Sequence, residues 1–414
     1  MTLAEAERLL LARELFGMRF GLDRTRRLLT ALGSPQTGLR VVEVVGSNGK
    51  SSTVRYCAAL LRRQGLRTGA YLSPHLASFT ERVRLDDADV GAADFAAAVA
   101  RAEAAAQKVD HTLTGGDRVT QFELLTAAAV DCLARLGAQA LVMEAGLGGR
   151  YDATNVLDAQ VAVLTNVGLE HTRWLGPTIT DIATEKLDVV RPGATLVTGA
   201  GLHPDALAVA EQVCAERGAR LVVAPADPGA GVALAARGAF QRRNLALAIA
   251  AADALAGPLA EGAAAAVAAT VTVPGRLEQL PGEPLTFVDG AHNAAGVAAL
   301  TAALPELIAG RPLVACIGVL EDKDAAAMLA GLLPLCAAVV LTRPDTPRAL
   351  SPATLASLCG QLGFVGTVEV VADPLVALAR ARELAGPGGA ALATGSIYLV
   401  ADLLARDRRA RSVL

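Results

Sequence analysis

A glycine-rich segment near the N-terminus has the residues of a phosphate-binding loop. Residues 46–52, GSNGKSS, follow an apolar run and precede a segment of helical period. Backbone N–H groups at the start of a helix favour anions, and Lys50 would place a positive charge on the β- and γ-phosphates of a nucleotide. The strict pattern requires glycine at position 44, where this chain has Val44, so an ordinary glycine turn before a helix is the alternative. The Gly-Lys-Ser sequence after an apolar strand favours phosphate.

Polar side chains also follow three other apolar runs. Glu144 ends the run ALVME, Ser73 follows AYL, and His171 follows VAVLTNVGLE. Open α/β sheets bind ligands at the carboxyl ends of their strands, so these side chains are candidates for a metal site. Each has an ordinary alternative, namely a surface acid, a turn serine and a structural histidine. Histidine is an uncommon magnesium ligand and by itself would favour zinc or manganese.

The elements that must position these residues follow an α/β pattern. Short apolar runs alternate with segments of helical period, which predicts mostly parallel sheets. The predicted strands are 39–45, 66–72, 138–145, 161–167, 285–288, 312–319, 337–342, 367–371 and 390–393. The predicted helices in the first part are 52–64, 92–108, 121–136 and 181–190. Proline and glycine punctuate residues 273–284, so we expect a nucleotide-binding domain at 1–276 and a smaller, Rossmann-like domain at 277–414.

Composition narrows the function classes. The 414 residues carry 38 Lys and Arg against 41 Asp and Glu, a net charge of -3, which gives no overall basic footprint for nucleic acid. Aromatic residues are only 3%, too few for stacking surfaces. The six cysteines show no zinc spacing, which indicates small buried hydrophobes in a reducing compartment. Charges within the first 20 residues argue against a signal peptide. We expect a cytoplasmic protein with neither a membrane nor a nucleic acid as partner.

Several blocks in a fixed order carry a more specific signal. They are GSNGKSS at 46–52, SPHL at 73–76, TQFE at 120–123, EAGLGGRYDATN at 144–155, HTRWLG at 171–176, FQRRN at 240–244, PGR at 274–276, DGAHN at 289–293 and TGSIYLV at 394–400. Together they resemble the folylpolyglutamate synthase/dihydrofolate synthase family of the Mur ligase superfamily, over nearly the whole chain. Ser51 departs from the family, which usually has glycine after the loop lysine.

The resemblance implies an ATP-dependent carbon–nitrogen ligase. Such an enzyme adds L-glutamate to dihydropteroate, to tetrahydrofolate (poly)glutamates, or to both, through an acyl phosphate. It implies that residues 1–276 are the ATP-binding domain, that 277–414 are the glutamate-ligase domain, and that the chain is a monomer. Its expected partners are ATP, L-glutamate and dihydropteroate or folate. Two alternatives stay open: a Mur-superfamily ligase for a cell-wall precursor, and a nucleotide-binding regulator without chemistry, which would lack a metal ligand or the hinge arginine.

The resemblance also assigns roles residue by residue. Catalytic roles fall on Lys50, Lys186 and His292. Nucleotide contacts fall on Gly49, Lys50, Ser51, Ser52, Asn244, Arg276 and Asp289. Two Mg²⁺ ions would be bound by Ser73, Glu144 and His171. The pterin would be bound by Leu22, Asp23, Arg24, Phe122, Tyr151, Asp152 and Ala153.

Lys186 has a role that the sequence pattern does not indicate. A lysine on the predicted helix 181–190 would ordinarily be a solvated side chain. The family carries a carbamylated lysine here, and a lysine of lowered pKa can react with CO₂ in this way. The resulting carbamate is an anion that would hold the metal or the γ-phosphate surroundings, so we expect carbamylated Lys186.

Overall fold

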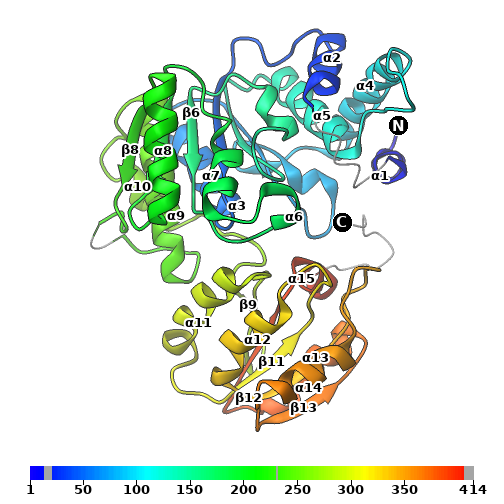
Figure 1. Ribbon diagram of the computed structural model, residues 1–414, viewed down its shortest axis with the longest axis vertical. Helices are drawn as coiled ribbons and strands as arrows, with labels where there is room; N and C mark the ends of the chain where they lie inside the picture. The colour runs from blue at the N-terminus through cyan, green and yellow to red at the C-terminus, as the bar shows by residue number, and fades with distance from the viewer. Residues whose placement is uncertain (14–20, 230–231, 405–414) are drawn as a thin grey trace. The chain divides into compact units, whose positions relative to one another are not determined.

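The chain forms two compact units. The computed structural model describes residues 1–13, 21–229 and 232–404. Unit 1 comprises Met1–Leu234 and Gln241–Val271, and unit 2 comprises Ala235–Phe240 and Thr272–Leu414. Both are α/β units (Figure 1), which confirms the predicted fold class. The functional labels given to residues 1–276 and 277–414 remain predictions.

Unit 1 is built on an eight-stranded sheet with the order β4-β3-β2-β5-β1-β6-β7-β8. Its strands are β1 (Arg40–Val45), β2 (Thr68–Tyr71), β3 (Val83–Leu85), β4 (Ala88–Asp89), β5 (Ala140–Glu144), β6 (Val161–Leu164), β7 (Thr195–Gly199) and β8 (Arg220–Ala224). In the described residues of this sheet, β3 pairs antiparallel with both β2 and β4, and the other strands pair in parallel. The central strand β1 lies between β5 and β6, with Val44 opposite Glu144 and Val45 opposite Leu164. The carboxyl ends of these three strands therefore open onto the same edge.

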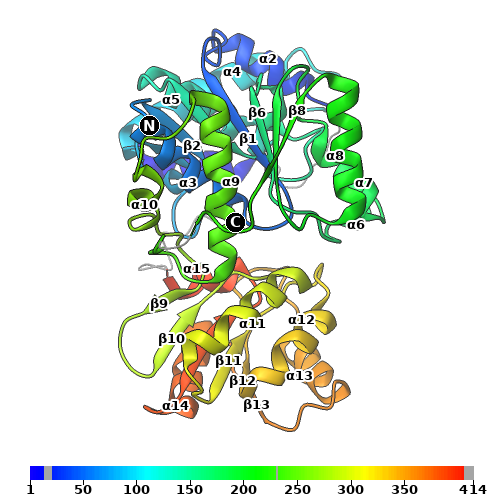
Figure 2. The same ribbon diagram turned by 90° about the vertical axis from the view of Figure 1, so that its left-hand side faces the viewer.

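Helices cover both faces of this sheet. They are α1 (Leu3–Ala12), α2 (Asp23–Ala31), α3 (Lys50–Arg63), α4 (Ala92–Asp110), α5 (Gln121–Arg135), α6 (Thr172–Leu175), α7 (Ile179–Leu187), α8 (Pro204–Arg217), α9 (Ala239–Ala256) and α10 (Ala263–Ala268), with the 3-10 turns η1 (Phe79–Arg82) and η2 (Ala153–Val156). In Figure 2, α7 and α8 are drawn at the right of unit 1 and α10 at its left. Helix α3 leads from β1 towards the β4 edge and α7 leads from β6 towards the β8 edge, so right-handed crossovers place the two helices on opposite faces of the sheet.

Unit 2 has a six-stranded sheet with the order β13-β12-β11-β14-β10-β9. Its strands are β9 (Glu278–Leu280), β10 (Leu285–Val288), β11 (Leu313–Ile317), β12 (Cys336–Leu341), β13 (Thr367–Val370) and β14 (Ala390–Thr394). Its helices are α11 (Ala294–Ile308), α12 (Ala325–Leu332), α13 (Pro352–Gln361), α14 (Pro374–Ala385) and α15 (Ile397–Leu404), with the 3-10 turn η3 (Leu333–Leu335). Only β9 pairs antiparallel, so the doubly wound prediction is confirmed for the remaining strands.

The predicted strands are all present, with ends that shift by a few residues, but five strands were not predicted. The hairpin β3–β4 and strand β9 are two or three residues long, too short for a recognisable pattern. Strand β8 is an edge strand and mostly solvent-accessible, and it was missed although residues 221–224 form a short apolar run. All six cysteines are unpaired and five are buried, as small hydrophobes would be. Across the described residues, every helix is too short or too polar to cross a membrane.

Candidate active site

The predicted phosphate loop connects β1 to α3 and requires its two glycines. Gly46 and Gly49 have φ of 145° and 84°, values that L side chains rarely adopt. A Cβ at Gly46 would collide with Thr165 Oγ1, and a Cβ at Gly49 would lie 2.5 Å from Asn244 Oδ1. The first N–H groups of α3 have no partner within the helix, which suits this loop to an anion. Asn244, a predicted nucleotide contact, therefore packs directly on the loop.

The end of β6 holds the phosphate loop in place. Ser47 N donates to Asn166 O at 3.1 Å, and Asn48 N donates to Asn166 Oδ1 at 2.9 Å. Thr165 Oγ1 donates to Asn48 O at 2.6 Å. Neither Thr165 nor Asn166 was predicted as a site residue, although both directly follow the apolar run of β6. Their position at a strand end was the signal that could have identified them.

Two lysines from opposite faces of the sheet reach the same carbonyl. Lys50 Nζ donates to Gly46 O at 2.9 Å, and Lys186 Nζ donates to it at 3.1 Å. Lys186 also donates to Glu170 Oε1 at 3.0 Å and is only 2% exposed. A solvated helix lysine is thus excluded. Glu170 was not predicted, although it stands directly before His171 in the sequence.

Charge and burial shift both members of this ion pair. Burial by itself would raise the pKa of Glu170, but the ammonium groups of Lys186 and Lys50 outweigh it and lower the pKa to about 2. Burial lowers the pKa of Lys186, with Lys50 acting in the same direction and Glu170 opposing it. Glu170 is therefore ionised at neutral pH. A lowered amine pKa is the property that reaction with CO₂ requires.

Glu144 joins the phosphate loop to the loop after β2. Ser51 Oγ donates to Glu144 Oε1 at 2.9 Å, and Ser73 N donates to Glu144 Oε2 at 3.1 Å. The carboxylate is 2% exposed at the end of β5. The Glu144 carboxylate and the Ser51 hydroxyl are oxygen donors, the kind that Mg²⁺ prefers, so these residues fit a divalent ion. Two of the three predicted metal ligands, Ser73 and Glu144, are in contact.

His171 lies at the neighbouring strand end. It precedes α6 with a left-handed backbone, φ 47°, and its carbonyl accepts from Trp174 N and Leu175 N. It also follows Glu170, the partner of Lys186. Within residues 1–13, 21–229 and 232–404, no three His, Cys, Asp or Glu side chains group as a metal cluster. A site that uses Glu144 together with a serine hydroxyl would not contain three such side chains.

The predicted pterin residue Arg24 is tied into the fold. It is 7% exposed, and its guanidinium donates to Glu123 Oε1 and to Asp117 Oδ2, both at 3.0 Å. Glu123 also closes the capping box of α5, so Arg24 holds α2 against the start of α5. Leu22 precedes α2, and Asp23 is its exposed first residue.

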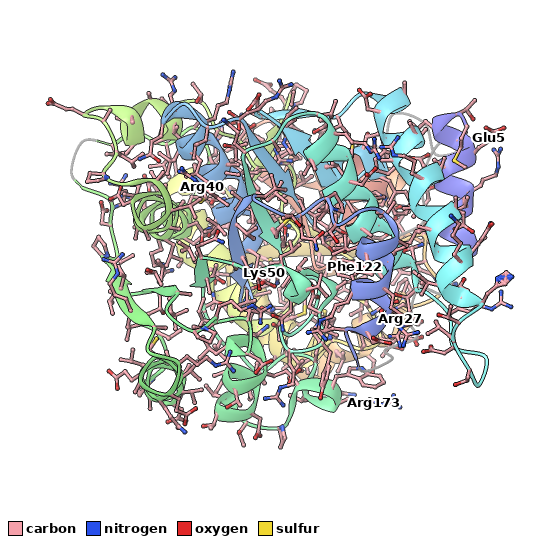
Figure 3. All side chains as sticks on the ribbon, turned by 90° about the horizontal axis from the view of Figure 1, so that it is seen from above. Glu5, Arg27, Arg40, Lys50, Phe122 and Arg173 are labelled. Atoms are coloured by element: carbon pink, nitrogen blue, oxygen red, sulfur yellow. The ribbon has the colours of Figure 1, made fainter. Side chains whose placement is uncertain are left out.

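Phe122 faces the loop that follows Glu144. A Cβ built at Gly146 would lie 2.6 Å from Phe122 Cζ, so only glycine leaves room for the ring. The ring centroid of Phe122 lies 6.0 Å from that of Tyr71. Lys50 and Phe122 are both labelled near the middle of Figure 3, whereas Glu5 and Arg173 lie towards its edges.

The remaining predicted pterin residues differ in exposure. Asp152 is 6% exposed, and its carboxylate accepts from Leu147 N at 2.8 Å and Thr154 N at 3.0 Å. Ala153 is buried as well. Tyr151 is 45% exposed, so its ring is accessible to a ligand. Asp152 therefore orders the loop that presents Tyr151.

The predicted residues of unit 2 gather around one turn after β10. Asp289 accepts hydrogen bonds from two backbone N–H groups, each at 2.8 Å. The Arg276 guanidinium packs against Gly290, and His292 Nδ1 lies 2.9 Å from Gly290 O. Burial raises the pKa of Asp289, and Arg276 opposes this shift. The predicted site residues thus form two groups, one within each unit.

Gly149 offers a first test of how tightly this site is packed. A Cβ there would collide with Lys186 O and lie 2.8 Å from Glu185 O. Both atoms are backbone, so relief requires moving the end of α7. We expect Gly149→Ala to lower the free energy of unfolding by about 1–3 kcal/mol in urea titrations. The matched control is Gly199→Ala, whose Cβ would meet only Leu247 Cδ2, at 3.7 Å. Equal stability of the two variants would contradict the expectation.

Comparison with known proteins points to one family. Residues 275–397 match the glutamate ligase domain of Mur ligases. The chain is 34% identical over 377 residues to the dihydrofolate synthase/folylpolyglutamate synthase of Mycobacterium tuberculosis, covering 82% of this chain and 77% of that protein. It is also 34% identical over 427 residues to a probable bifunctional folylpolyglutamate synthase/dihydropteroate synthase of Haloferax volcanii, covering 96% of this chain. The chain spans about half of that protein's length, 49%.

Solved structures agree with the sequence comparison. Mycobacterium tuberculosis folylpolyglutamate synthase complexed with ADP has a TM-score of 0.89 and 31% identity, covering 96% of each chain. Escherichia coli FolC in complex with DHPP and ADP has a TM-score of 0.85 and 28% identity, covering 98% of this chain and 97% of that one. A Yersinia pestis bifunctional enzyme complexed with AMPPNP and Mn ion has a TM-score of 0.84 and 28% identity, covering 98% and 97%. This chain belongs to the folylpolyglutamate synthase/dihydrofolate synthase family.

Proposed function

We propose that this protein is an ATP-dependent ligase that joins L-glutamate to a folate-type carboxylate. The acceptors are dihydropteroate, tetrahydrofolate (poly)glutamates, or both. The observation that carries the proposal is similarity to folate ligases over nearly the whole chain, together with a phosphate loop backed by two lysines. The named relatives support a folate acceptor over a cell-wall precursor.

The chemistry requires activation of a carboxylate. Attack of the carboxylate oxygen on the γ-phosphorus of ATP forms an acyl phosphate and releases ADP. The amine of glutamate then attacks the acyl carbon, loses a proton, and inorganic phosphate leaves from the tetrahedral intermediate. Both steps bring anions together, so the protein chiefly positions them and neutralises their charge.

The phosphate loop supplies the first of these functions. In the proposed site, N–H groups of Gly49, Ser51 and Ser52 bind phosphate oxygens, and Lys50 turns from the Gly46 carbonyl to the β- and γ-phosphates. Asn244, which packs on Gly49, limits where the adenine of ATP can lie. The lysine carries a mobile point charge, which suits a phosphate that moves during transfer.

Glu144, Ser73 and His171 would hold the divalent metal, with two Mg²⁺ ions proposed. The oxygen set around Glu144 supports one ion, and His171 beside Glu170 supports a second. When bound, the metal neutralises charge on the phosphates. We also propose a carbamate on Lys186, because the amine is buried, has a lowered pKa and lies within reach of the phosphate loop.

Unit 2 carries proposed nucleotide contacts of its own. Arg276 is proposed to neutralise phosphate charge and Asp289 to bind the ribose, with His292 assisting Asp289. Their position around one turn, at Gly290, supports a joint role. Residues 277–414 are accordingly proposed as the glutamate-ligase domain. For the pterin, the exposed Tyr151 and the ring of Phe122 are the proposed contacts, with Leu22, Asp23, Arg24, Asp152 and Ala153 shaping their surroundings.

The test is phosphate release from ATP with Mg²⁺ and L-glutamate. Three reactions are compared: with dihydropteroate, with tetrahydrofolate, and without an acceptor. Turnover that depends on either pterin supports the proposal, and the ratio of the two rates shows whether both synthase activities are present. Tight ATP binding without pterin-dependent turnover would overturn the folate assignment.

A further inference from the structure

Glu43 is an acidic side chain inside the central strand of unit 1. It is 0% exposed in β1, where Met143 of β5 and Ala162 of β6 are its register partners. Its Oε1 lies 2.7 Å from Thr154 Oγ1, and its Oε2 finds no hydrogen-bond partner in the described part of the chain. An ionised carboxylate at such a position is costly unless it is paired and fully hydrogen-bonded. One short contact does not meet that requirement.

Thr154 also touches a second buried carboxyl. Its Oγ1 lies 2.6 Å from Asp152 Oδ1 as well as 2.7 Å from Glu43 Oε1. A threonine hydroxyl has a single proton to donate, so it cannot donate to both. The second contact is a hydrogen bond only if that carboxyl is protonated and donates to Oγ1. Two carboxyls that share one donor therefore hold one proton of their own.

The surroundings assign that proton to Glu43. Burial raises the pKa of Asp152 as well, but Asp152 accepts from Leu147 N and Thr154 N, bonds that favour its ionised form, whereas Glu43 Oε2 has no hydrogen-bond partner in the described residues. Burial raises the pKa of Glu43 to about 8, Thr154 opposes this, Asp152 raises it further, and Arg191 lowers it. The Arg191 guanidinium is bonded to carbonyls around η2, for example Leu157 O at 3.1 Å. The charged groups that face Glu43 are thus Asp152 and Arg191.

This chain of hydrogen bonds ends at the active-site loop. Asp152 Oδ2 holds Leu147 N at 2.8 Å, in the segment that directly follows Glu144. We propose that Glu43 is a positioning residue of the ligase and acts as a neutral acid: its O–H donates to Thr154, Thr154 donates to Asp152, and Asp152 holds the loop that presents Tyr151. This inference rests on the proposed function, because the loop is a proposed pterin contact.

The proposal predicts an alkaline loss of pterin-dependent turnover. Above pH about 8, Glu43 ionises and competes with Asp152 for the one Thr154 proton, so Asp152 loses the hydrogen bond from Thr154 Oγ1 and holds its loop less firmly. The neutral fraction, and with it kcat/KM for the pterin, should fall about tenfold for each further pH unit. Below that pH the neutral form of Glu43 dominates, so its titration should cause no change in kcat/KM for the pterin.

Three variants separate the two properties of Glu43, donation of a hydrogen bond to Thr154 and ionisation at alkaline pH. Glu43→Gln keeps an N–H donor for Thr154 but cannot ionise, so it should retain turnover and lose the alkaline decline. Glu43→Met removes the donor and should raise KM for the pterin about tenfold or more at every pH, with KM for ATP little changed. The exposed Glu261→Gln is the matched control and should keep the wild-type profile. If Glu43→Met does not fold, the presence or absence of the alkaline decline in Glu43→Gln decides the proposal.

A measurement that does not depend on activity accompanies the kinetics. Infrared spectra should show the carbonyl band of a protonated carboxylic acid at neutral pH, lost in Glu43→Gln and titrating near pH 8 in the wild type. Absence of that band overturns the proposal. So does a Glu43→Gln enzyme with the wild-type alkaline decline. If the wild type does not turn over any pterin, the proposed function fails and the positioning role fails with it, while the infrared titration still decides whether Glu43 is a neutral acid.

Discussion

Glu144→Gln is expected to lower turnover about a thousandfold and to leave the chain folded. The amide keeps the size of the side chain and an oxygen for Ser73 N, which the carboxylate accepts at 3.1 Å. It removes the negative charge that a divalent ion requires, and an interaction worth several kcal/mol corresponds to about three powers of ten in rate. Because the carboxylate lies at a strand end and outside the apolar core, we expect an unchanged urea midpoint.

Metal dependence provides the control for this variant. The Mg²⁺ concentration that supports half-maximal nucleotide binding should rise in Glu144→Gln and in Glu144→Ala. It should stay unchanged in Glu211→Gln, an exposed acid on α8. Loss of folded protein in both position-144 variants would move Glu144 to a structural role. Unchanged Mg²⁺ dependence with full turnover would exclude it as a metal ligand.

Lys186→Met is expected to reduce both stability and turnover. The variant leaves Glu170, whose side chain is 8% exposed, without its 3.0 Å partner. Breaking a buried ion pair costs about 3–5 kcal/mol of unfolding free energy when one charge stays buried alone, and Lys50, which also acts on Glu170, should keep the loss towards the lower end of this range. Turnover should fall at least a hundredfold if the lysine or its carbamate acts on the phosphates.

The pH dependence of stability gives an independent signature. The pKa of Glu170 lies below its ordinary value, at about 2, so its contribution to stability is present above the unfolded-state pKa and is lost as the pH falls through about 2. In Lys186→Met the pKa should rise, and this acid-dependent contribution should shrink. Urea titrations at pH 7 and at acid pH measure the difference.

A double variant separates stability from chemistry. Lys186→Met with Glu170→Gln removes both charges and should recover most of the lost stability without recovering turnover. Carbon-13 spectra after labelling with bicarbonate should show a carbamate signal in the wild type and none in either variant. A single variant as stable as the wild type, or a double variant with full turnover, would contradict the assigned role.

Local patterns were sufficient where a residue's neighbours in sequence are also its neighbours in space. The phosphate loop was identified from GSNGKSS, since its two glycines and Lys50 act within one turn between β1 and α3. Nine of the fourteen strands in the described residues were identified, because most of them are apolar on both faces, as buried parallel strands are. Strand β7, although buried, was missed, because its two threonines leave only Leu196 and Val197 as an apolar run.

Residues whose partners are distant in sequence were beyond any local pattern. Lys186 was expected to be solvated from sequence alone, yet its ammonium bonds a carbonyl 140 positions away. Arg24 carries no local sign of its partner Glu123, 99 positions on. Glu43 was hidden inside an apolar strand, and its partner Thr154 is 111 positions away.

Residue types and their spacing along the chain were enough to predict the α/β class, the phosphate loop and, through the order of the blocks, the resemblance to folate ligases. These depend on residue type and spacing, which are read along the chain. Tertiary structure decided which side chains meet. Strand β1 lies between β5 and β6, so Glu144, Thr165 and Asn166 come to its end, and helices on opposite faces bring Lys50 and Lys186 to one carbonyl. Burial then shifts the pKa of Lys186 at that junction and the pKa of Glu43 inside β1, and no sequence pattern indicates either shift.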